Sequence, residues 1–575
     1  MTLEESFIAD NIESDLVVIY MSSGCNNTLS SIAEAWLQPN FCAATYTSGL
    51  YEPRGLHINS NNDELLLVEK GSSRIVRLDN AGTSIVPVSP VIYGLSHGIE
   101  VSNNGYIYAS TPTTVYRVPY EAGQRQTPSS IDGVEEVIVG MDRFASGELG
   151  APDGHTSRTL AFDPEKKWLY VSIGSEGNVD TDSHRARIRR FYIASWEEES
   201  YSSSNSTVVL RRTPMEFNNG EIFADGLRNE VGLAFDSFGV LWGVENGADN
   251  LYRSDLGGDV HNDNPAEELN RFSESNAGRH WGYPYCWSEY CLSSSVGGMG
   301  IKGAGTIWAW PDFLNTVMTG NDNDGTVITD NWCRTNTIPS AVAMPSHSAP
   351  LGITFYNWTD MSQTAEECTG GFPRSMDKYA FIAFHGSWNR DPPTGYKVVF
   401  VPFDNQGNPT GQQPIDLFRH DGETAEWSSG SRPVDLQFDH CGRLYVTDDG
   451  VGSVISITYA GQYTDEYVPI DTDVADGPSC SSAVLSLNDT PLVPPPTVMP
   501  VPPPTPLISQ GSNSPSSSET LVSVPDDEFL TSPPTITLPK LLDPPLSSVS
   551  SALTVMSIII LLCFYSAIQL IDVIR

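Results

Sequence analysis

A short unit of paired β-strands recurs along most of this 575-residue chain. In each unit an apolar strand of about five residues is followed by a tight turn, such as Asn-Gly, Phe-Gly or Cys-Gly, and a second strand. The units span residues 54–78, 97–118, 158–175, 231–254, 379–403 and 434–457. Six units over about 440 residues leave roughly 70 residues each, enough for a four-stranded blade with long loops. The repeat therefore predicts an all-β, six-bladed β-propeller over residues 22–465, with a large β-sandwich as the alternative.

Composition agrees with this fold and excludes one class of partner. The chain has 48 Gly, 41 Pro and 10% aromatic residues, which favours turn-rich β structure over helical bundles. Residues 255–345, rich in Gly, Asn and Trp, are predicted to be an insertion between blades. The net charge is 31 − 71 = −40. Because a duplex nucleic-acid binder needs cations to displace counterions, we expect no nucleic-acid partner.

The segments on either side of the predicted propeller differ from it in composition. Residues 1–21 carry acids where a signal peptide needs cations, so they form an N-terminal lead and not a convincing signal peptide. Residues 466–545 are a Pro/Ser/Thr-rich linker, and 16 of the 41 prolines fall within 491–545, which predicts a disordered stalk. Residues 552–571 carry no charge and are long enough for one bilayer crossing. We therefore predict a C-terminal hydrophobic helix, either transmembrane or the signal for a lipid anchor.

Cysteines and glycosylation sequons indicate the compartment. There are nine cysteines, and setting Cys563 of the apolar tail aside leaves eight. Pairs such as Cys25 with Cys42, or Cys286 with Cys291, are possible, but sequence does not fix the connectivity. The absence of a CxxC pair argues against a zinc site. Four N-glycosylation sequons begin at residues 26, 205, 357 and 488. Together these features predict a cell-surface protein with an extracellular propeller and a membrane-anchored tail.

Polar residues at equivalent positions of different blades are candidates for one shared site. In a propeller the loops at one end of every blade converge on the central channel. The candidates are Arg54, His97, His155, Arg228 with Asn229, the turn Glu245-Asn246-Gly247-Ala248, Arg390 and Arg432. This set is cationic within an acidic protein, which suits a small anionic ligand that bears carboxylates.

The ordered segments that hold these candidates resemble a known family. The segments are 154–175, 225–250, 347–356, 384–399 and 432–449. They are similar to the soluble quinoprotein glucose/sorbosone dehydrogenases, and more closely to the fungal pyranose dehydrogenases. The resemblance implies a six-bladed propeller that binds pyrroloquinoline quinone (PQQ) and Ca²⁺ and oxidises the anomeric carbon of a sugar to a lactone. It also implies a separate electron acceptor, such as a cytochrome or a quinone.

The resemblance assigns a role to each candidate residue. His155 matches the general base that takes the proton of the anomeric hydroxyl, and Arg228 matches the cation beside the reacting quinone carbonyl. The turn Gly247-Ala248 matches the calcium-binding turn, which supplies main-chain oxygens, although glucose dehydrogenase relatives have proline in place of Ala248. The implied cofactor contacts are Arg54, His97, Arg158, Asn229, Arg390 and Arg432.

Two aromatic residues and two non-catalytic functions complete the predictions. Trp281 and Trp388 are expected either to line the sugar pocket or to pack in the core. The alternative functions are a propeller that binds an extracellular signalling protein and a protein that binds cell-wall sugars without oxidising them. The presence of both His155 and Arg228 favours the enzyme.

Overall fold

The computed structural model describes the greater part of the predicted propeller. The described residues are 32–59, 64–78, 82–125, 133–142, 154–182, 184–198, 212–292, 303–316, 326–358, 368–461 and 466–470. The N-terminal lead, most of the linker and the apolar segment 552–571 lie outside this set, so what the sequence predicts for them stays a prediction. Among the described residues, no helix is both long enough and apolar enough to span a bilayer.

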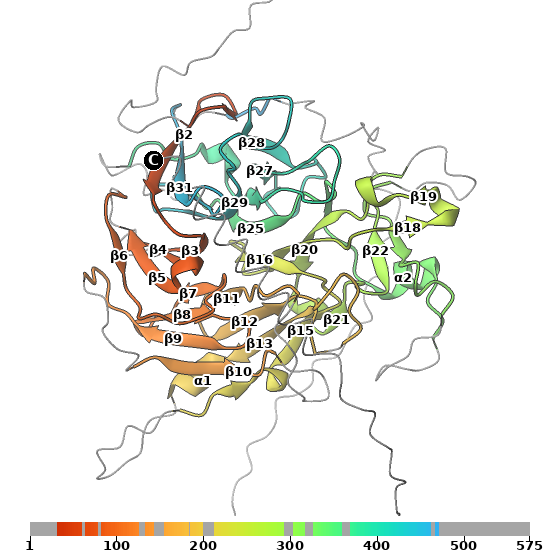
Figure 1. Cartoon of the computed structure of the whole chain (residues 1–575), viewed down its shortest axis with the longest axis horizontal. Coiled ribbons are helices and arrows are strands. Elements are labelled where there is room, and N and C mark those ends of the chain that lie inside the picture. Colours follow the sequence, from red (N-terminus) through yellow and green to blue (C-terminus); the bar gives the residue numbers. More distant parts are fainter. Residues whose placement is uncertain are drawn as a thin grey trace, which may run out of the picture. The chain divides into compact units, whose positions relative to one another are not determined.

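Six sheets surround a common centre, which confirms the predicted six-bladed propeller (Figure 1). From the innermost strand outwards, blade one consists of β3 (Pro53–Asn59), β4 (Glu64–Glu69), β5 (Arg74–Leu78) and β6 (Ile85–Pro87). Blade two consists of β7 (Ile99–Val101), β8 (Tyr106–Ser110), β9 (Val115–Pro119), β10 (Glu135–Val139) and β14 (Met215–Glu216). Blade three consists of β11 (Leu160–Phe162), β12 (Trp168–Ile173), β13 (Arg187–Tyr192), β15 (Glu221–Asp225) and β21 (Arg279–His280).

The second half of the ring follows the same plan. Blade four consists of β16 (Glu230–Phe235), β17 (Leu241–Glu245), β20 (Glu267–Phe272) and β24 (Val342–Met344). Blade five consists of β25 (Pro350–Phe355), β26 (Ala380–Phe384), β27 (Lys397–Val401), β28 (Ile415–His420) and β1 (Ala35–Leu37). Blade six consists of β29 (Pro433–Phe438), β30 (Leu444–Asp448), β31 (Ser453–Tyr459) and β2 (Phe41–Ser48). The innermost strands contact one another in order around the ring, and β29 returns to β3.

The ring is closed by strands from opposite ends of the propeller sequence. β2 pairs antiparallel with β31 in blade six, from Phe41 opposite Tyr459 to Ser48 opposite Ser453. β1 pairs with β28 at the outer edge of blade five. The recurring sequence unit did not reveal these pairings, because β1 and β2 precede its first copy.

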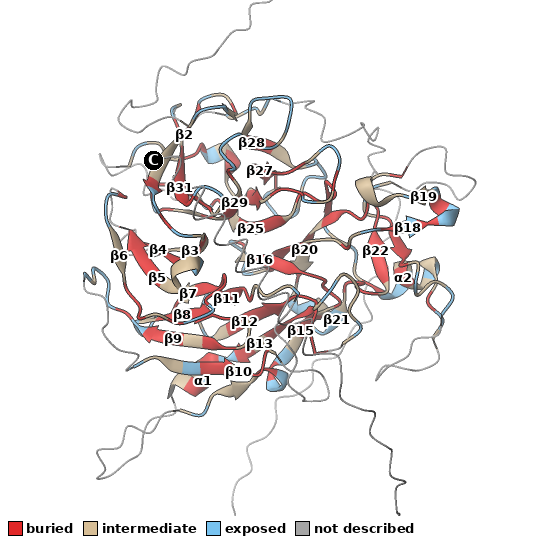
Figure 2. Ribbon diagram, in the orientation of Figure 1, coloured by how far each residue is buried: buried red, intermediate tan, exposed pale blue. Residues whose placement is uncertain are grey.

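The blades are held together by apolar faces that alternate along each strand. All five residues of β26 are buried, as Figure 2 shows for many of the blade strands. Phe381 and Ala383 belong to a core shared with blade six, whereas Ile382 and Phe384 belong to a core shared with blade four. Because successive side chains of a strand point to opposite faces, one short apolar strand packs against both neighbouring blades.

The insertion predicted between blades at residues 255–345 lies instead within blade four, because β20 and β24 are that blade's outer strands. The same stretch supplies β21 to blade three and, with β18 just before it, forms the lobe marked by β18, β19, β22 and α2 in Figure 1. The lobe contains two ribbons and a helix: β18 (Tyr252–Arg253) with β19 (Gly258–Asp259), β22 (Cys286–Ser288) with β23 (Ile307–Ala309), and α2 (Asp330–Asn336).

A disulfide and a cluster of tryptophans stabilise this lobe. Cys286 is bonded to Cys333, so the pairing of Cys286 with Cys291 that the sequence left open is wrong. Cys291 is itself in a disulfide. A small core of buried residues includes Trp287, Trp308 and Trp310. The disulfide joins residues 47 apart in the chain and adds a covalent constraint to a lobe whose own core is small.

Candidate active site

One end of the central channel receives a polar side chain from every blade. Arg54 lies in β3, and the other five residues precede the innermost strand of their own blade: His97, His155, Arg228, His347 and Arg432. Loops between the second and third strands of the blades reach the same end. They contribute Ser175, Gly247, Asp249, His385 and Asp449. The predicted convergence of loop residues from different blades therefore occurs in the structure.

His155 is held as a neutral imidazole with a defined tautomer. Its Nδ1 lies 3.0 Å from the carbonyl oxygen of Ser175. A carbonyl oxygen only accepts, so Nδ1–H donates and the lone pair is left on Nε2. Burial, followed by the nearby positive charge of Arg228, lowers the pKa of His155 to about 4. His155 is therefore a proton acceptor at neutral pH.

The strand β12 and the start of blade four hold His155 in place. Ser175 N–H donates to the carbonyl oxygen of Arg228 at 2.7 Å, and His155 N–H donates to Ser175 O at 3.0 Å. A Cβ on Gly174 would lie 2.6 Å from Asn229 Oδ1 and 2.7 Å from the His155 Cβ. Only glycine fits there without a shift of its neighbours, so the backbone of blade three approaches Asn229 directly.

Arg228 is a buried guanidinium whose donors are all directed at fixed oxygens. It donates to Gly247 O at 2.6 Å, to Asn178 O at 3.2 Å and Oδ1 at 3.1 Å, and to Asp249 Oδ2 at 3.0 Å. The main-chain N–H of Arg228 donates to the Glu245 carboxylate. These contacts give a positive charge of defined position between the loops of blades three and four.

The turn Gly247-Ala248 directs main-chain oxygen toward this cation. Gly247 O accepts from Arg228, and Gly247 N–H donates to Glu267 Oε2 at 2.6 Å. Ala248 is buried. The next residue, Asp249, brings a carboxylate beside the turn and also accepts a hydrogen bond from Asn389 Nδ2. Main-chain and carboxylate oxygens close together are the ligands that Ca²⁺ prefers.

A second polar cluster joins blades one, five and six. Asp449 accepts from Arg54 and from His385 Nε2, each at 2.8 Å. Arg432 donates to His385 O at 3.1 Å and to Gly386 O at 2.8 Å. The predicted cations Arg54 and Arg432 therefore lie on either side of one His–Asp pair.

His97 lies beside the second cluster, and Arg158 supports the loop of His155. His97 is buried near Arg54, and its pKa is lowered to about 3 by burial first and by Arg54 second. His97 Nδ1 has no hydrogen-bond partner among the described residues. Arg158 donates to the main-chain oxygens of His155, Ser157 and Pro112 at 2.6–3.0 Å. These hydrogen bonds hold the His155 loop against the loop of blade two that contains Pro112.

Arg390, Trp281 and Trp388 are not part of the two polar clusters described above. The Arg390 guanidinium donates to Asp263 Oδ1 at 3.0 Å and to Asn262 O at 3.0 Å, which joins its loop to the chain before β20. Trp281 is buried and packs on Phe272 with ring centroids 4.9 Å apart. Trp388, in contrast, is 77% exposed on the loop after β26. Trp281 therefore packs in the core, and it also lines a small cavity with Arg228, Gly247 and Ala248. Trp388 has an accessible ring.

The sequence did not single out His347 or Asp249. His347 Nε2 lies 2.6 Å from His261 O, and Nδ1 lies 3.8 Å from Asp249 Oδ1. His347 was recognisable because it opens the segment 347–356 and precedes an innermost strand, as the other ring residues do. The acids carried no such signal, because they follow second strands and gain their role only by pairing with cations from elsewhere.

Three carboxyls lie in a row beneath the site. Glu230, Glu245 and Glu268 are direct cross-strand neighbours in β16, β17 and β20, and Asn270 Nδ2 donates to Glu230 and Glu245 at 3.2 Å each. Burial is the main cause that raises the pKa of all three, to about 7 for Glu268. Mutual repulsion adds to the effect for Glu230 and Glu245.

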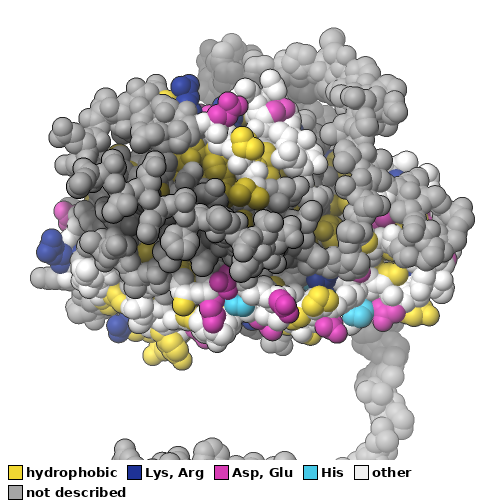
Figure 3. Space-filling view, turned by 90° about the horizontal axis from the view of Figure 1, so that it is seen from above, with side chains coloured by type: hydrophobic (Ala, Val, Ile, Leu, Met, Phe, Trp, Pro, Cys, Tyr) yellow, Lys and Arg dark blue, Asp and Glu magenta, His cyan; other side chains and the backbone are white. Residues whose placement is uncertain are grey.

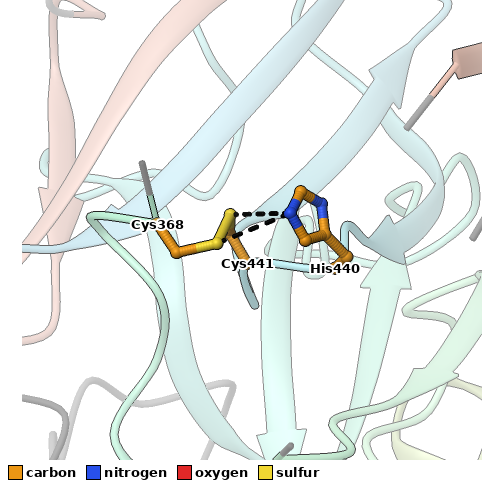
Figure 4. A group of neighbouring side chains, drawn as sticks. All are labelled: Cys368, His440 and Cys441. Carbon is orange, nitrogen blue, oxygen red and sulfur yellow. Dashed lines mark hydrogen bonds between the residues drawn. A yellow bond between two sulfur atoms is a disulfide. The ribbon is translucent and has the colours of Figure 1, made fainter. Parts of the chain in front are cut away.

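The far end of the channel has a different chemistry. A cavity of about 480 Å³ runs along the innermost strands from Gly55 and His97 to Phe438 and His440. Beside that end, His440 Nε2 lies 3.5 and 3.4 Å from the sulfurs of Cys368 and Cys441 (Figure 4). The two sulfurs form a disulfide, so this cluster offers no thiolates to a metal in the oxidised protein.

The chain as a whole is acidic, with a net charge of −40. In the view of Figure 3, Asp and Glu side chains lie at the top and along the lower edge of the described surface, among basic and apolar side chains. At the end of the channel, Arg54 and Arg228 are each paired with an aspartate, so carboxylates offset part of the positive charge that the sequence predicted there.

The fold and this ring of polar side chains define a propeller protein with its site at one end of the channel. Residues 35–460 match the family described as TrAA12-like, and the chain belongs to this family. A PQQ-dependent pyranose dehydrogenase from Coprinopsis cinerea is 27% identical over 447 residues, which cover 72% of this chain and 53% of that protein. A PQQ-dependent sugar dehydrogenase from Hypocrea jecorina is 29% identical over 428 residues, covering 71% of this chain and 85% of that protein.

A solved structure supports the same relationship. The holo form of the PQQ domain of the Coprinopsis cinerea pyranose dehydrogenase matches with a TM-score of 0.57 and 27% identity, covering 74% of this chain and 97% of that domain. The chain spans about half the length of the Coprinopsis relative. The resemblance to quinoprotein sugar dehydrogenases that the sequence indicated is therefore confirmed.

Proposed function

We propose that this propeller is a PQQ- and calcium-dependent dehydrogenase that oxidises the anomeric carbon of a sugar to a lactone. The observation that carries the proposal is the juxtaposition of a neutral, oriented His155 with the fixed cation Arg228 and the Gly247 carbonyl. The family match and the names of the relatives support the same chemistry. The electrons would pass to a separate acceptor such as a cytochrome or a quinone.

The residues of the ring fit the two groups. PQQ is an anion that bears carboxylates, and Arg54 and Arg432 offer guanidinium donors on one side of the ring. His97 Nδ1, buried without a partner among the described residues, offers one further polar contact. Gly247 O and the Asp249 carboxylate are hard oxygens suited to Ca²⁺. Asn229 and Ala248, on the same loops, are two further contacts implied by the resemblance. Arg158 and Arg390, also implied, donate to protein oxygens of neighbouring loops.

The protein's own part in the reaction follows from these positions. When bound, PQQ supplies the two-electron redox chemistry, which no side chain provides. His155 Nε2 accepts the proton of the anomeric hydroxyl, and the Ser175 carbonyl stabilises the resulting imidazolium through Nδ1–H. The Arg228 guanidinium would stabilise the negative charge that develops beside it during the oxidation. The guanidinium need not reorient for this, because its hydrogen bonds already fix its position. The exposed ring of Trp388 is an accessible surface on which a sugar stacks.

The location of the protein is proposed from the sequence. The disulfides Cys286–Cys333 and Cys368–Cys441 agree with an oxidising compartment. The linker 466–545 and the apolar segment 552–571 support a propeller tethered at the cell surface. Membrane fractionation of cells that express the full chain, with and without residues 552–571, tests the tether.

Reconstitution of the purified protein tests the function. We expect PQQ with Ca²⁺ to bind the full chain with micromolar or tighter affinity, measured by quenching of tryptophan fluorescence. The loaded protein should then reduce a dye with some members of a panel of aldoses. Absence of PQQ binding in this range contradicts the enzyme proposal and favours a non-catalytic propeller.

A further inference from the structure

A buried carboxylate behind the Gly247-Ala248 turn has no place in the chemistry described so far. Glu267 opens β20 and its side chain is enclosed by protein, with 3% of the residue exposed. Its two oxygens accept backbone hydrogen bonds from two different loops: Oε2 from Gly247 N–H at 2.6 Å, and Oε1 from Ala349 N–H at 3.2 Å. Burial of a carboxylate is costly unless its oxygens are satisfied, so these two bonds specify the arrangement.

The two loops belong to neighbouring blades. Gly247 follows β17 in blade four, whereas Ala349 directly precedes β25 in blade five. The second loop has a demanding backbone, since His347 and Ala349 have φ of 58° and 53°, in the left-handed region that non-glycine residues rarely adopt. Such residues are strained and persist only where surrounding contacts hold them. Glu267 provides one of these contacts to the loop that carries His347.

We propose that Glu267 is a positioning residue that orients the Gly247-Ala248 turn for Ca²⁺, an inference that rests on the proposed function. Its hydrogen bond to Gly247 N–H fixes the peptide unit just before the Gly247 carbonyl. The hydrogen bond from Ala349 N–H fixes the turn against the loop that carries His347. His347 Nδ1 in that loop lies 3.8 Å from Asp249 Oδ1. One carboxylate thus sets the distance between the calcium turn of blade four and the polar loop of blade five.

The substitution Glu267→Gln separates this role from simple filling of space. Glutamine has nearly the same volume but a single acceptor oxygen, so its NH₂ group would face one of the two backbone N–H donors. Removal of a group that hydrogen-bonds a metal ligand, without itself binding the metal, typically weakens metal binding about 10–100-fold. We expect the dissociation constant for Ca²⁺, measured by calorimetric titration of the full-length protein without PQQ, to rise by about that factor.

Asp435→Asn is the matched control. Asp435 is a buried carboxylate in β29 whose oxygens also accept two backbone N–H bonds, from Leu56 at 2.8 Å and from Leu436 at 2.9 Å. It joins blades six and one, away from the turn. Both variants should lose thermal stability to a similar degree, but only Glu267→Gln should lose calcium affinity. A purely structural role of Glu267 predicts equal affinities in the two variants.

The titrations distinguish failure of this inference from failure of the proposed function. Wild-type protein that gives no calcium isotherm overturns the calcium part of the proposed function, and the inference with it. Wild-type binding combined with unchanged affinity in Glu267→Gln overturns the inference alone. If Glu267→Gln does not fold, Glu267→Asp provides the test, because it keeps the charge but is one methylene too short to reach both loops. Unchanged affinity in that variant also overturns the inference.

Discussion

At the scale of single residues, His155 is the most informative position. His155→Ala removes the proposed base but leaves Arg228, Gly247 and Arg432 in place. We expect PQQ and Ca²⁺ to bind as in the wild type while kcat falls by about 10²–10⁴-fold, the usual contribution of a general base. Stopped-flow reduction of the bound cofactor by sugar measures the effect. Retention of full activity excludes His155 from this role.

The pH dependence of activity tests the environment of the same histidine. The pKa of His155 is lowered from 6.5 to about 4 by burial and by Arg228, so the ring accepts protons at all pH values well above 4. Activity should therefore rise with pH through about 4 and be level between 5.5 and 8, to the extent that His155 governs it. The pH profile of kcat/KM gives the answer. A midpoint near 6.5 would mean that the imidazole is solvated in the working enzyme.

The sequence predicted most of the polar residues near the innermost strands, but not the ion pairs that they form. Arg54, His97, His155, Arg228 and Arg432 converge because each stands near the start of an innermost strand, and that position is visible in the repeat. Asp249 and Asp449, which neutralise two of the arginines, come from loops of variable length. Their partners lie 21 and 395 residues away, so no local pattern announces them.

At the scale of elements, the row of acids across β16, β17 and β20 predicts a pH-dependent stability. The pKa of Glu230 is raised by burial and by Glu245, so the folded state keeps a proton that the unfolded state has already released. Stability is therefore lost as pH rises from the ordinary carboxyl range through the folded-state pKa. Glu230→Gln has no proton to lose and still accepts from Asn270. We expect its Tm to exceed that of the wild type at pH 8 by about 2 °C or more, and by less at pH 5.

Thermal unfolding followed by circular dichroism at both pH values measures this difference. The control is Glu121→Gln, an exposed glutamate on the loop after β9. It should show the same change of Tm between pH 5 and 8 as the wild type. A Tm of Glu230→Gln that follows the wild type at both pH values shows that the row of acids does not govern alkaline stability.

The elements themselves were only partly predictable. Five of the six recurring units contain the innermost strand of a blade, because alternating apolar residues and Gly-containing turns are local signals. The unit 379–403 instead contains β26 and β27 of blade five and misses its innermost strand β25. The outer strands were less visible: β14 and β21 have two residues each, and they join blades two and three by parallel pairing from remote positions. The sequence predicts an insertion between blades because the two blade-four strands β20 and β24 are separated by β21, the ribbon β22–β23 and α2, which do not follow the repeat.

At the scale of the whole molecule, stability depends on closure of blade six. Phe41 of β2 is buried, with ring centroids 4.8 Å from Phe372 and 5.0 Å from Tyr459. We expect Phe41→Ala to lower the free energy of unfolding by about 3–5 kcal/mol, because it leaves a cavity in the closing strand. Denaturant titration measures the loss. Tyr93→Ala, at an aromatic ring that is 88% exposed, should change stability by about 0.5 kcal/mol or less.

The pairing of β2 with β31 also has a consequence for synthesis of the chain. The segment 41–48 leaves the ribosome first, yet its partner 453–459 is made more than 400 residues later. During that interval an early strand and the side of the first blade present unpaired backbone and apolar surface, the features that make nascent β-proteins prone to aggregate. The ring can therefore close only after residues 453–459 have been made, when 116 of the 575 residues remain to be added. Until then, chaperones encounter an incomplete propeller.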